Sequence, residues 1–221
     1  MQQLGIFAKY WEAGQVKTRL AKTEGSARAA ALYHEFLRTS LQRFAGVADK
    51  SVVAYTPGDR RDDFANLAGG DWELRRQSDG DLGQRMQHFF HDALRDRDGR
   101  VVLVGADTPT LPLELINEAF AALDTHRAVL GPTTDGGYYL VGLSRCLPEI
   151  FDGIPWSTAA VWSQTVAQLE AFDIPFYRLA AWYDVDDHQS FAQLRQELTG
   201  QLAHDSKFAD LRQVVLGSDS R

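Results

Sequence analysis

The chain has 221 residues, 44% of them hydrophobic, and this size and composition fit one globular domain with a buried core. Its formal net charge of −7 at pH 7 argues against broad nucleic-acid binding, which needs many phosphate-neutralising lysines and arginines on one face. Cys146 is the single cysteine, which excludes an internal disulfide, and no apolar run is long enough for a bilayer span or a signal peptide, so we expect a cytoplasmic protein without a membrane partner.

The first half of the chain alternates strand and helix patterns. Residues 4–8 form an apolar run typical of a buried strand, whereas residues 9–22 lack apolar periodicity and predict a loop. From Ser26 onward, apolar side chains recur at helical spacing until a helix end near Gly46. The next expected elements are a strand at 51–55, a short helix before Gly69, and a strand at 72–75.

The second half continues this alternation. Residues 101–105, with the sequence VVLVG, are too short for a helix and predict a central, buried strand. The remaining expected elements are a helix from Leu82 to about Ala93, a helix at 112–123, strands at 128–130, 138–143 and 176–179, and a helix at 158–172. We expect the domain to span residues 1–200, with residues 201–221 as a peripheral helix or a loose tail.

Strands that alternate with helices predict an α/β fold, here a single-domain three-layer sandwich in which helices cover both faces of a mostly parallel central sheet. Sheets of this kind bind ligands outside the carboxyl ends of their strands. Lys9 and Asp107 each lie at such an end. The sequence therefore places the candidate site at this edge of the sheet.

Four cations fall within fourteen residues of the loop after the first strand: Lys9, Lys17, Arg19 and Lys22. Local positive charge on an acidic protein favours a small anionic ligand, and the guanidinium of Arg19 can bind a phosphate through two hydrogen bonds. The following helix adds partial positive charge at its amino end, although the loop lacks the Gly-Lys-Ser/Thr of a P-loop. The alternative is a solvated loop with ordinary surface cations.

Asp107 ends the central strand in the sequence GADTPTLP, before a turn with two prolines. Mg²⁺ and Mn²⁺ prefer hard oxygen ligands and commonly take one or two carboxylates together with substrate phosphates. Asp107 is therefore a candidate metal ligand. The alternatives are a cap on the helix that begins near Pro112 or an Asx turn.

The segment GPTTDGGYY, residues 131–139, lies between two expected strands. Gly136 and Gly137 would let the backbone pass close to a ligand, and Asp135 could bind a sugar hydroxyl, a metal-bound water or an acceptor proton. A hairpin turn built on Asp-Gly has much the same sequence, so both interpretations stand.

Three carboxylates follow the strand expected at 176–179: Asp184, Asp186 and Asp187. In an extended segment Asp184 and Asp186 point to the same side, so they could close a metal site with Asp107. The alternative is helix initiation, with Asp187 as the N-cap. Different aspartates can serve the two roles.

Two further segments are weaker candidates. QSDGDLGQRM, residues 77–86, predicts a flexible loop entering a helix, suited to lying beside a nucleotide. IPWST, residues 154–158, predicts a helix start with Ser157 or Thr158 as the cap.

Taken together, FAKYWEAGQVKTRL, QSDGDLGQRM, GADTPTLP, GPTTDGGYYLVGL, IPWST and DVDD occur in the order found in the DUF2064 family of glycosyltransferase-like proteins. The chain resembles this family over about residues 4–190, which implies the GT-A fold of the nucleotide-diphospho-sugar transferases. Two positions depart from similar sequences. Trp11 stands where proline is common, and DVDD followed by His188 replaces DVDT followed by an acidic residue, which puts a catalytic role for Asp187 in doubt.

The resemblance implies a role for each motif. Lys9, Lys17 and Arg19 would face a nucleotide's phosphates, and Asp107 would take the place of the metal aspartate. The segment with Gly80, Asp81 and Gly83 would lie near the base. The acceptor side would be lined by Asp135, Gly136, Gly137, Tyr138 and Asp186.

The leading hypothesis is glycosyl transfer from a nucleotide-diphosphate sugar to a small-molecule acceptor. Mg²⁺ or Mn²⁺ on Asp107 and Asp186 would neutralise the leaving diphosphate, Lys17 and Arg19 would hold it, and Asp135 or Asp186 would deprotonate the acceptor. One alternative is nucleotidyl transfer from a nucleotide triphosphate to a phosphorylated substrate, as in the guanylyltransferases that the basic loop also resembles. Another is a nucleotide-binding protein without catalysis.

Overall fold

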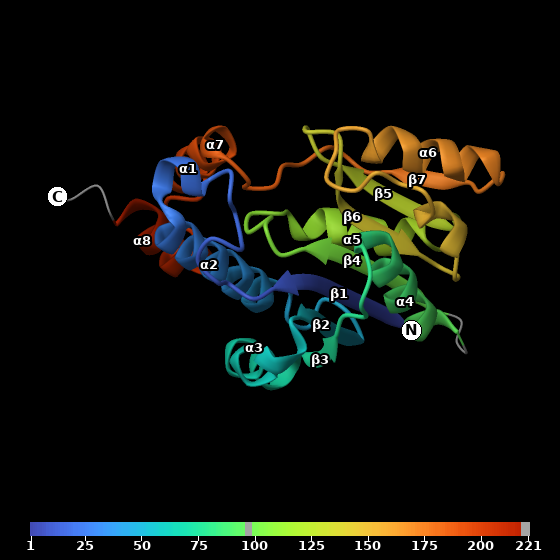
Figure 1. The fold of residues 1–221 in the computed structure, drawn as a ribbon, viewed down its shortest axis with the longest axis horizontal. Coiled ribbons are helices and arrows are strands. Elements are labelled where there is room, and N and C mark those ends of the chain that lie inside the picture. Colours follow the sequence, from blue (N-terminus) through green and yellow to red (C-terminus); the bar gives the residue numbers. More distant parts are fainter. Residues whose placement is uncertain (96–98, 218–221) are drawn as a thin grey trace.

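The computed structural model describes residues 1–95 and 99–217, and its centre is a seven-stranded sheet in the order β3-β2-β1-β4-β6-β5-β7 (Figure 1). Strand β6 is antiparallel to its two neighbours, and the other adjacent pairs are parallel. The expected α/β fold with a mostly parallel sheet is confirmed. The strands are β1 Gln2–Lys9, β2 Lys50–Thr56, β3 Glu73–Arg76, β4 Arg100–Gly105, β5 Ala128–Pro132, β6 Tyr138–Leu143 and β7 Phe176–Arg178.

Helices cover both faces of the sheet, because successive strand residues point to opposite sides and are apolar on both. Leu4 and Ile6 of β1 pack in the hydrophobic cluster that includes side chains of α2, α3 and α5, whereas Val52 of β2 and Leu103 of β4 pack in the cluster that includes α4 and α6. The helices of these two layers are α2 Ser26–Phe44, α3 Arg61–Ala68, α4 Leu82–Leu94, α5 Leu113–Ala122 and α6 Val161–Ala171.

A third cluster lies on the far side of α2, where α7 (His188–Thr199) and α8 (Ala209–Leu216) pack beside it (Figure 1). Leu211 and Val215 of α8 are buried there against Leu32 and Phe36 of α2. For residues 201–221 the sequence left a peripheral helix or a loose tail as alternatives. Up to residue 217 this segment contains a helix, α8, and that helix packs in the core. Residues 218–221 of that segment lie outside the described residues.

Two local expectations were wrong. The loop expected at 9–22 ends in a short helix, α1 Ala21–Glu24. Helix α6 begins at Val161 rather than near Thr158, and its N-cap, Ala160, makes no capping hydrogen bond through its side chain. Neither Ser157 nor Thr158 caps the helix, because an additional turn precedes it: Thr158 Oγ1 accepts from the N–H of Ala160 at 3.3 Å and donates to the carbonyl of Pro155 at 2.8 Å.

Within residues 1–95 and 99–217, no helix combines the length and the hydropathy that crossing a bilayer requires.

Candidate functional site

The candidate site lies at the carboxyl edge of the sheet, where β1 and β4 are parallel neighbours. The loop that begins after Lys9 and the residue Asp107 therefore leave the sheet side by side. Because β6 runs antiparallel, the turn between β5 and β6 is at the same edge, and Thr133 in that turn forms a bridge with Trp182. Four segments far apart in the sequence meet here, at the edge of the sheet where the sequence placed the candidate site.

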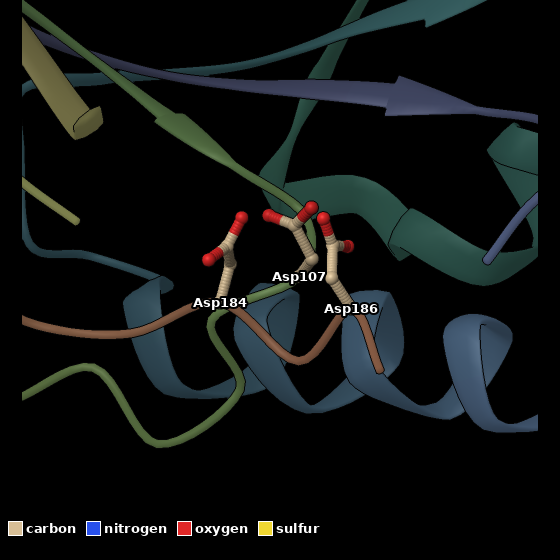
Figure 2. Close-up of side chains that lie close together, drawn as sticks. All are labelled: Asp107, Asp184 and Asp186. Carbon is tan, nitrogen blue, oxygen red and sulfur yellow. The ribbon is translucent and has the colours of Figure 1, made fainter. Parts of the chain in front are cut away.

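Three carboxylates converge at this edge (Figure 2). Asp107, Asp184 and Asp186 each offer an oxygen atom, and these atoms lie within 4.8 Å of one another. Val185 separates the two aspartates of the segment after β7; its side chain is fully buried, and its N–H donates to the carbonyl of Asp107 at 2.9 Å. Alternation along this extended segment therefore turns Asp184 and Asp186 to the same side, as expected.

Lys17 contacts two of these carboxylates. Its Nζ lies 2.9 Å from Asp107 Oδ2 and 2.5 Å from Asp186 Oδ1, and its side chain is only 4% exposed. Burial alone would lower the pKa of Lys17, but the charges of both aspartates and their hydrogen bonds outweigh it and raise the pKa above its ordinary value. Lys17 is therefore a charged, buried partner of the cluster rather than a surface cation.

Asp184 is the third carboxylate of the cluster, and its burial and its neighbours make it hard to ionise. Burial, followed by the charges of Asp107, Asp186 and Asp135, raises the pKa of Asp184 to about 7. The cluster has three carboxylates against one ammonium, and oxygen donors are what Mg²⁺ and Mn²⁺ prefer. The residues present thus fit a divalent ion. The alternative role for Asp107, a cap on α5, is wrong because Pro112 is the N-cap and makes no side-chain capping bond.

Arg19 lies at the rim of the cluster with its side chain 54% exposed. Its guanidinium donates to Asp187 and lies 4.0 Å from Asp186 Oδ2. Asp187 caps α7, since its Oδ1 accepts from the N–H groups of Gln189 and Ser190. The hydrogen bonds from Ser190, together with Arg19, lower the pKa of Asp187 below its ordinary value. The N-cap interpretation of Asp187 is confirmed.

Lys9 does not join the cluster. Its Nζ donates to the carbonyl of Gln15 at 2.8 Å, within its own loop, and its backbone N–H donates to the hydroxyl of Tyr33 at 3.1 Å. Tyr33 also lies under Lys17, whose Nζ is 5.7 Å from the centre of the ring. The structure thus brings Lys17 and Arg19 to the carboxylates, but not Lys9.

The turn between β5 and β6 has the hydrogen bonds of the tight-turn interpretation. Asp135 Oδ1 accepts from Thr133 Oγ1 at 2.6 Å and from the N–H of Gly137 at 3.3 Å, as in a tight turn. Gly136 has a φ of +93°, and a Cβ there would lie 2.3 Å from the carbonyl oxygen of Ala159, so only glycine fits. Asp135 nevertheless also lines the cleft described next.

A cleft of about 640 Å³ opens over the carboxylates. Its polar lining includes Asp107, Asp135, Asp184, Asp186 and Arg19. Its apolar lining includes Leu82, Tyr138 and Trp156; Leu82 is 42% exposed, and the two rings pack edge to face, 6.4 Å between centres. A polar pocket of about 350 Å³ continues from the carboxylates toward the start of α7.

Of residues 77–84, Leu82 lines this cleft, and several of the others have structural partners. The amide of Gln77 donates to the carbonyls of Ala8 and Ala54, which fixes the loop to the ends of β1 and β2. Asp81 caps α4 through a capping box with Gln84. A Cβ at Gly83 would lie 2.7 Å from Trp156 Nε1, so this glycine lets α4 approach the Trp156 segment. The capping box and this close packing account for Asp81 and Gly83 without a ligand.

Sequence reasoning did not identify Leu82 and Trp156 as cleft residues. Both stand inside segments that the sequence singled out, but as a loop and as a helix start. Their exposure beside the carboxylates depends on contacts between α4, β6 and the segment before α6, which no local pattern encodes. Tyr33 was also missed as a site residue, because its helical spacing indicates only a core position.

Comparison with known proteins gives a family and a fold. Residues 40–158, more than half of the chain, match the model of DUF2064, described as an uncharacterized protein conserved in bacteria. A candidate nucleotide-diphospho-sugar transferase of Desulfovibrio desulfuricans G20 is 34% identical, with a TM-score of 0.87 over 98% of this chain and 97% of that one. No protein with a curated function matches the sequence.

More distant solved structures share the fold alone. A 4-diphosphocytidyl-2C-methyl-D-erythritol synthase of Anaerococcus prevotii DSM 20548 is 13% identical, with a TM-score of 0.62 over 90% of this chain and 98% of that one. A CMP:2-keto-3-deoxy-manno-octonic acid synthetase, solved with CTP, is also 13% identical, with a TM-score of 0.54 over 90% of this chain and 99% of that one. The family match and the 34% identity over nearly the whole length establish that this chain belongs to the DUF2064 family.

Proposed function

We propose that this protein is a transferase that uses a nucleotide-activated donor, and that the donor is a nucleotide-diphosphate sugar whose glycosyl group passes to an acceptor hydroxyl. The similarity to a candidate nucleotide-diphospho-sugar transferase supports the sugar donor, and the shared fold of two nucleotide-using synthases supports the broader class. The observation that carries the proposal is the meeting of Lys17 and Arg19 with three carboxylates at one cleft.

The leaving diphosphate is the group that this arrangement serves best. A departing nucleoside diphosphate gains negative charge at its terminal phosphate, and donors already in place stabilise that charge more than water does. Arg19, exposed at the rim, can offer two N–H groups to phosphate oxygens, and Lys17 adds a second cation. A divalent ion held by Asp107 and Asp186, with Asp184 as a further ligand, would supply charge neutralisation to the same phosphates.

The acceptor lies, in this proposal, against Asp135, which lines the same cleft as the carboxylates. The acceptor oxygen forms a bond to the anomeric carbon, the bond from that carbon to the diphosphate breaks, and the hydroxyl proton passes to Asp135. We assign the proton to Asp135 rather than Asp186 because Asp186 is already paired with Lys17 and lies near Arg19. Tyr138 and Trp156 provide an apolar lining of the kind that packs against the C–H face of a sugar.

Nucleotidyl transfer to a phosphorylated substrate remains the second candidate, and one observation favours it. The Oδ1 atom of Asp135 is engaged by Thr133 and Gly137, which limits its freedom as a base. A substrate phosphate is already ionised and needs no carboxylate to take its proton. Lys17, Arg19 and the carboxylate cluster would serve this reaction equally well.

Product analysis separates the two reactions. The protein would be incubated with Mn²⁺ and, in parallel, nucleotide-diphosphate sugars and nucleotide triphosphates, and the released phosphates would be identified by mass spectrometry. Water can replace the missing acceptor at a slow rate. Release of nucleoside diphosphate and free sugar supports glycosyl transfer; release of pyrophosphate from a triphosphate supports the second candidate instead.

A further inference from the structure

Lys17 lies where an ion shared by Asp107 and Asp186 would have to bind. Its Nζ contacts Asp107 Oδ2 at 2.9 Å and Asp186 Oδ1 at 2.5 Å, so one ammonium bridges two of the three carboxylates proposed as metal ligands. No other cation among the described residues bridges Asp107 and Asp186. The side chain already supplies part of the positive charge that this cluster needs.

The packing around Lys17 holds the ammonium in this position. Val16 and Leu20, on either side of it in the chain, are buried and anchor the loop in the core. The Lys17 side chain is 4% exposed and passes over the ring of Tyr33. Its φ of +46° is in the left-handed region, which is uncommon for a residue with a side chain. This position is therefore built by the fold and is not one rotamer of a mobile surface lysine.

We infer that Lys17 competes with the divalent ion for Asp107 and Asp186, and that the donor's phosphates relieve this competition. An ammonium and a divalent ion repel each other, and both need the same carboxylate oxygens. When a diphosphate enters the cleft, Lys17 exchanges its carboxylate partners for phosphate oxygens, and the carboxylates become available to the ion. Ion and donor then bind with positive coupling, and the ion alone binds weakly. This inference rests on the proposed function.

Without nucleotide, removing Lys17 should strengthen metal binding, whereas removing a lysine that serves only the phosphates should leave it unchanged. A lysine that only contacts phosphate should not change metal affinity when no nucleotide is present. If Lys17 competes with the ion, its removal leaves three carboxylates without their ammonium, and the ion should bind more tightly.

The test is a Mn²⁺ titration without nucleotide, followed by the EPR signal of free Mn²⁺, on wild type, Lys17→Met, Lys22→Met and Asp107→Asn. Lys22 is exposed in helix α1, so Lys22→Met removes an equal charge away from the carboxylates. We expect the dissociation constant of Lys17→Met to fall by about fivefold or more, the low end of typical coupling between two ligands. Lys22→Met should match wild type, and Asp107→Asn should lose the site. An unchanged or weaker affinity in Lys17→Met would overturn the inference.

A second measurement covers the case in which Lys17→Met does not fold. Crystals of the wild-type protein would be soaked in Mn²⁺ and the ion located by its anomalous signal. We expect Lys17 Nζ to have left Asp107 and Asp186 wherever the ion is present. An ion on Asp107 beside a Lys17 that still donates to both aspartates would overturn the inference. Neither experiment measures transfer, so a failure here leaves the proposed reaction to its own product analysis.

Discussion

The backbone N–H of Val185 donates to the carbonyl of Asp107 at 2.9 Å, which joins the segment after β7 to the end of β4. The fully buried Val185 side chain packs in the cluster between α2, α7 and α8. Its two neighbours, Asp184 and Asp186, consequently face the cleft on either side of Asp107 (Figure 2). The carboxylate cluster thus depends on a core contact outside the site itself.

Replacing Val185 with alanine should weaken both the fold and the carboxylate cluster. The lost methyl groups and the cavity they leave should lower the free energy of unfolding by about 2 kcal/mol. Chemical denaturation would measure this, with Val214→Ala as the control, because Val214 is 37% exposed. Equal losses in the two variants would contradict the role given to Val185. A Mn²⁺ titration of the folded variant should also show weaker binding than wild type.

Gly136→Ala should destabilise the protein more than Gly153→Ala, although both glycines have a positive φ. At Gly136 the added Cβ meets the carbonyl of Ala159, in addition to the strain of a positive φ. Gly153 is the control, because it has a φ of +69° and a Cβ added there would meet nothing within 4 Å. Gly153→Ala should cost about 1–2 kcal/mol from strain alone. A thermal melt in which Gly136→Ala is no less stable than Gly153→Ala would contradict this account of the turn.

His34 should make stability depend on pH. Burial lowers the pKa of His34 below 6.5, and Arg38 acts in the same direction against the opposing charge of Glu35. In the unfolded chain the imidazole takes up a proton as the pH falls through 6.5, whereas the folded protein resists it, so stability is lost in that direction. Urea denaturation at pH 5 to 8 would compare the free energy of unfolding of wild type and His34→Gln. We expect the difference between the two to change only below about pH 6.5, where the unfolded imidazole takes up a proton. NMR titration of the His34 ring giving a pKa above 6.5 would contradict this prediction.

The same ring shows why Trp11 can replace the proline of similar sequences. Trp11 packs edge to face on His34, 4.6 Å between ring centres, and on Phe64 at 5.2 Å. The loop after β1 is therefore held by aromatic contacts rather than by a fixed proline φ.

Asp135→Asn tests whether Asp135 is the base in glycosyl transfer. Asparagine retains an oxygen that can accept from Thr133 and Gly137, so the turn should persist. Loss of a general base should lower the rate of glycosyl transfer by roughly 10²-fold to 10⁴-fold while donor binding stays close to wild type. Steady-state kinetics with the donor found by product analysis would measure both quantities. A rate of glycosyl transfer within a few-fold of wild type would exclude Asp135 as the base.

The sequence predicts the inner strands of the sheet well because they are short apolar runs that are buried on both faces, as for residues 101–105 within β4. It also predicts that Asp184 and Asp186 share a side, since alternation is a local property. The contact of Lys17 with Asp107 and Asp186 spans 90 and 169 residues, and no local pattern records it. Helix α8 was hard to predict because it is only eight residues long and buries only Leu211 and Val215. Thr158 does not cap α6 as expected, because its hydroxyl bonds within a turn that precedes the helix, and the residues typical of a cap are also typical of a turn.

The most direct test of the central claim, that Asp107 and its neighbours hold a metal ion that serves a nucleotide donor, is a thermal-shift panel. Wild type and Asp107→Ala would be melted with UDP, GDP, CDP, their sugars, GTP and CTP, each with and without Mn²⁺. We expect one nucleotide-diphosphate sugar to stabilise wild type only when Mn²⁺ is present, and Asp107→Ala to lose this stabilisation. Equal shifts in wild type and Asp107→Ala, or no shift with any nucleotide, would contradict the claim.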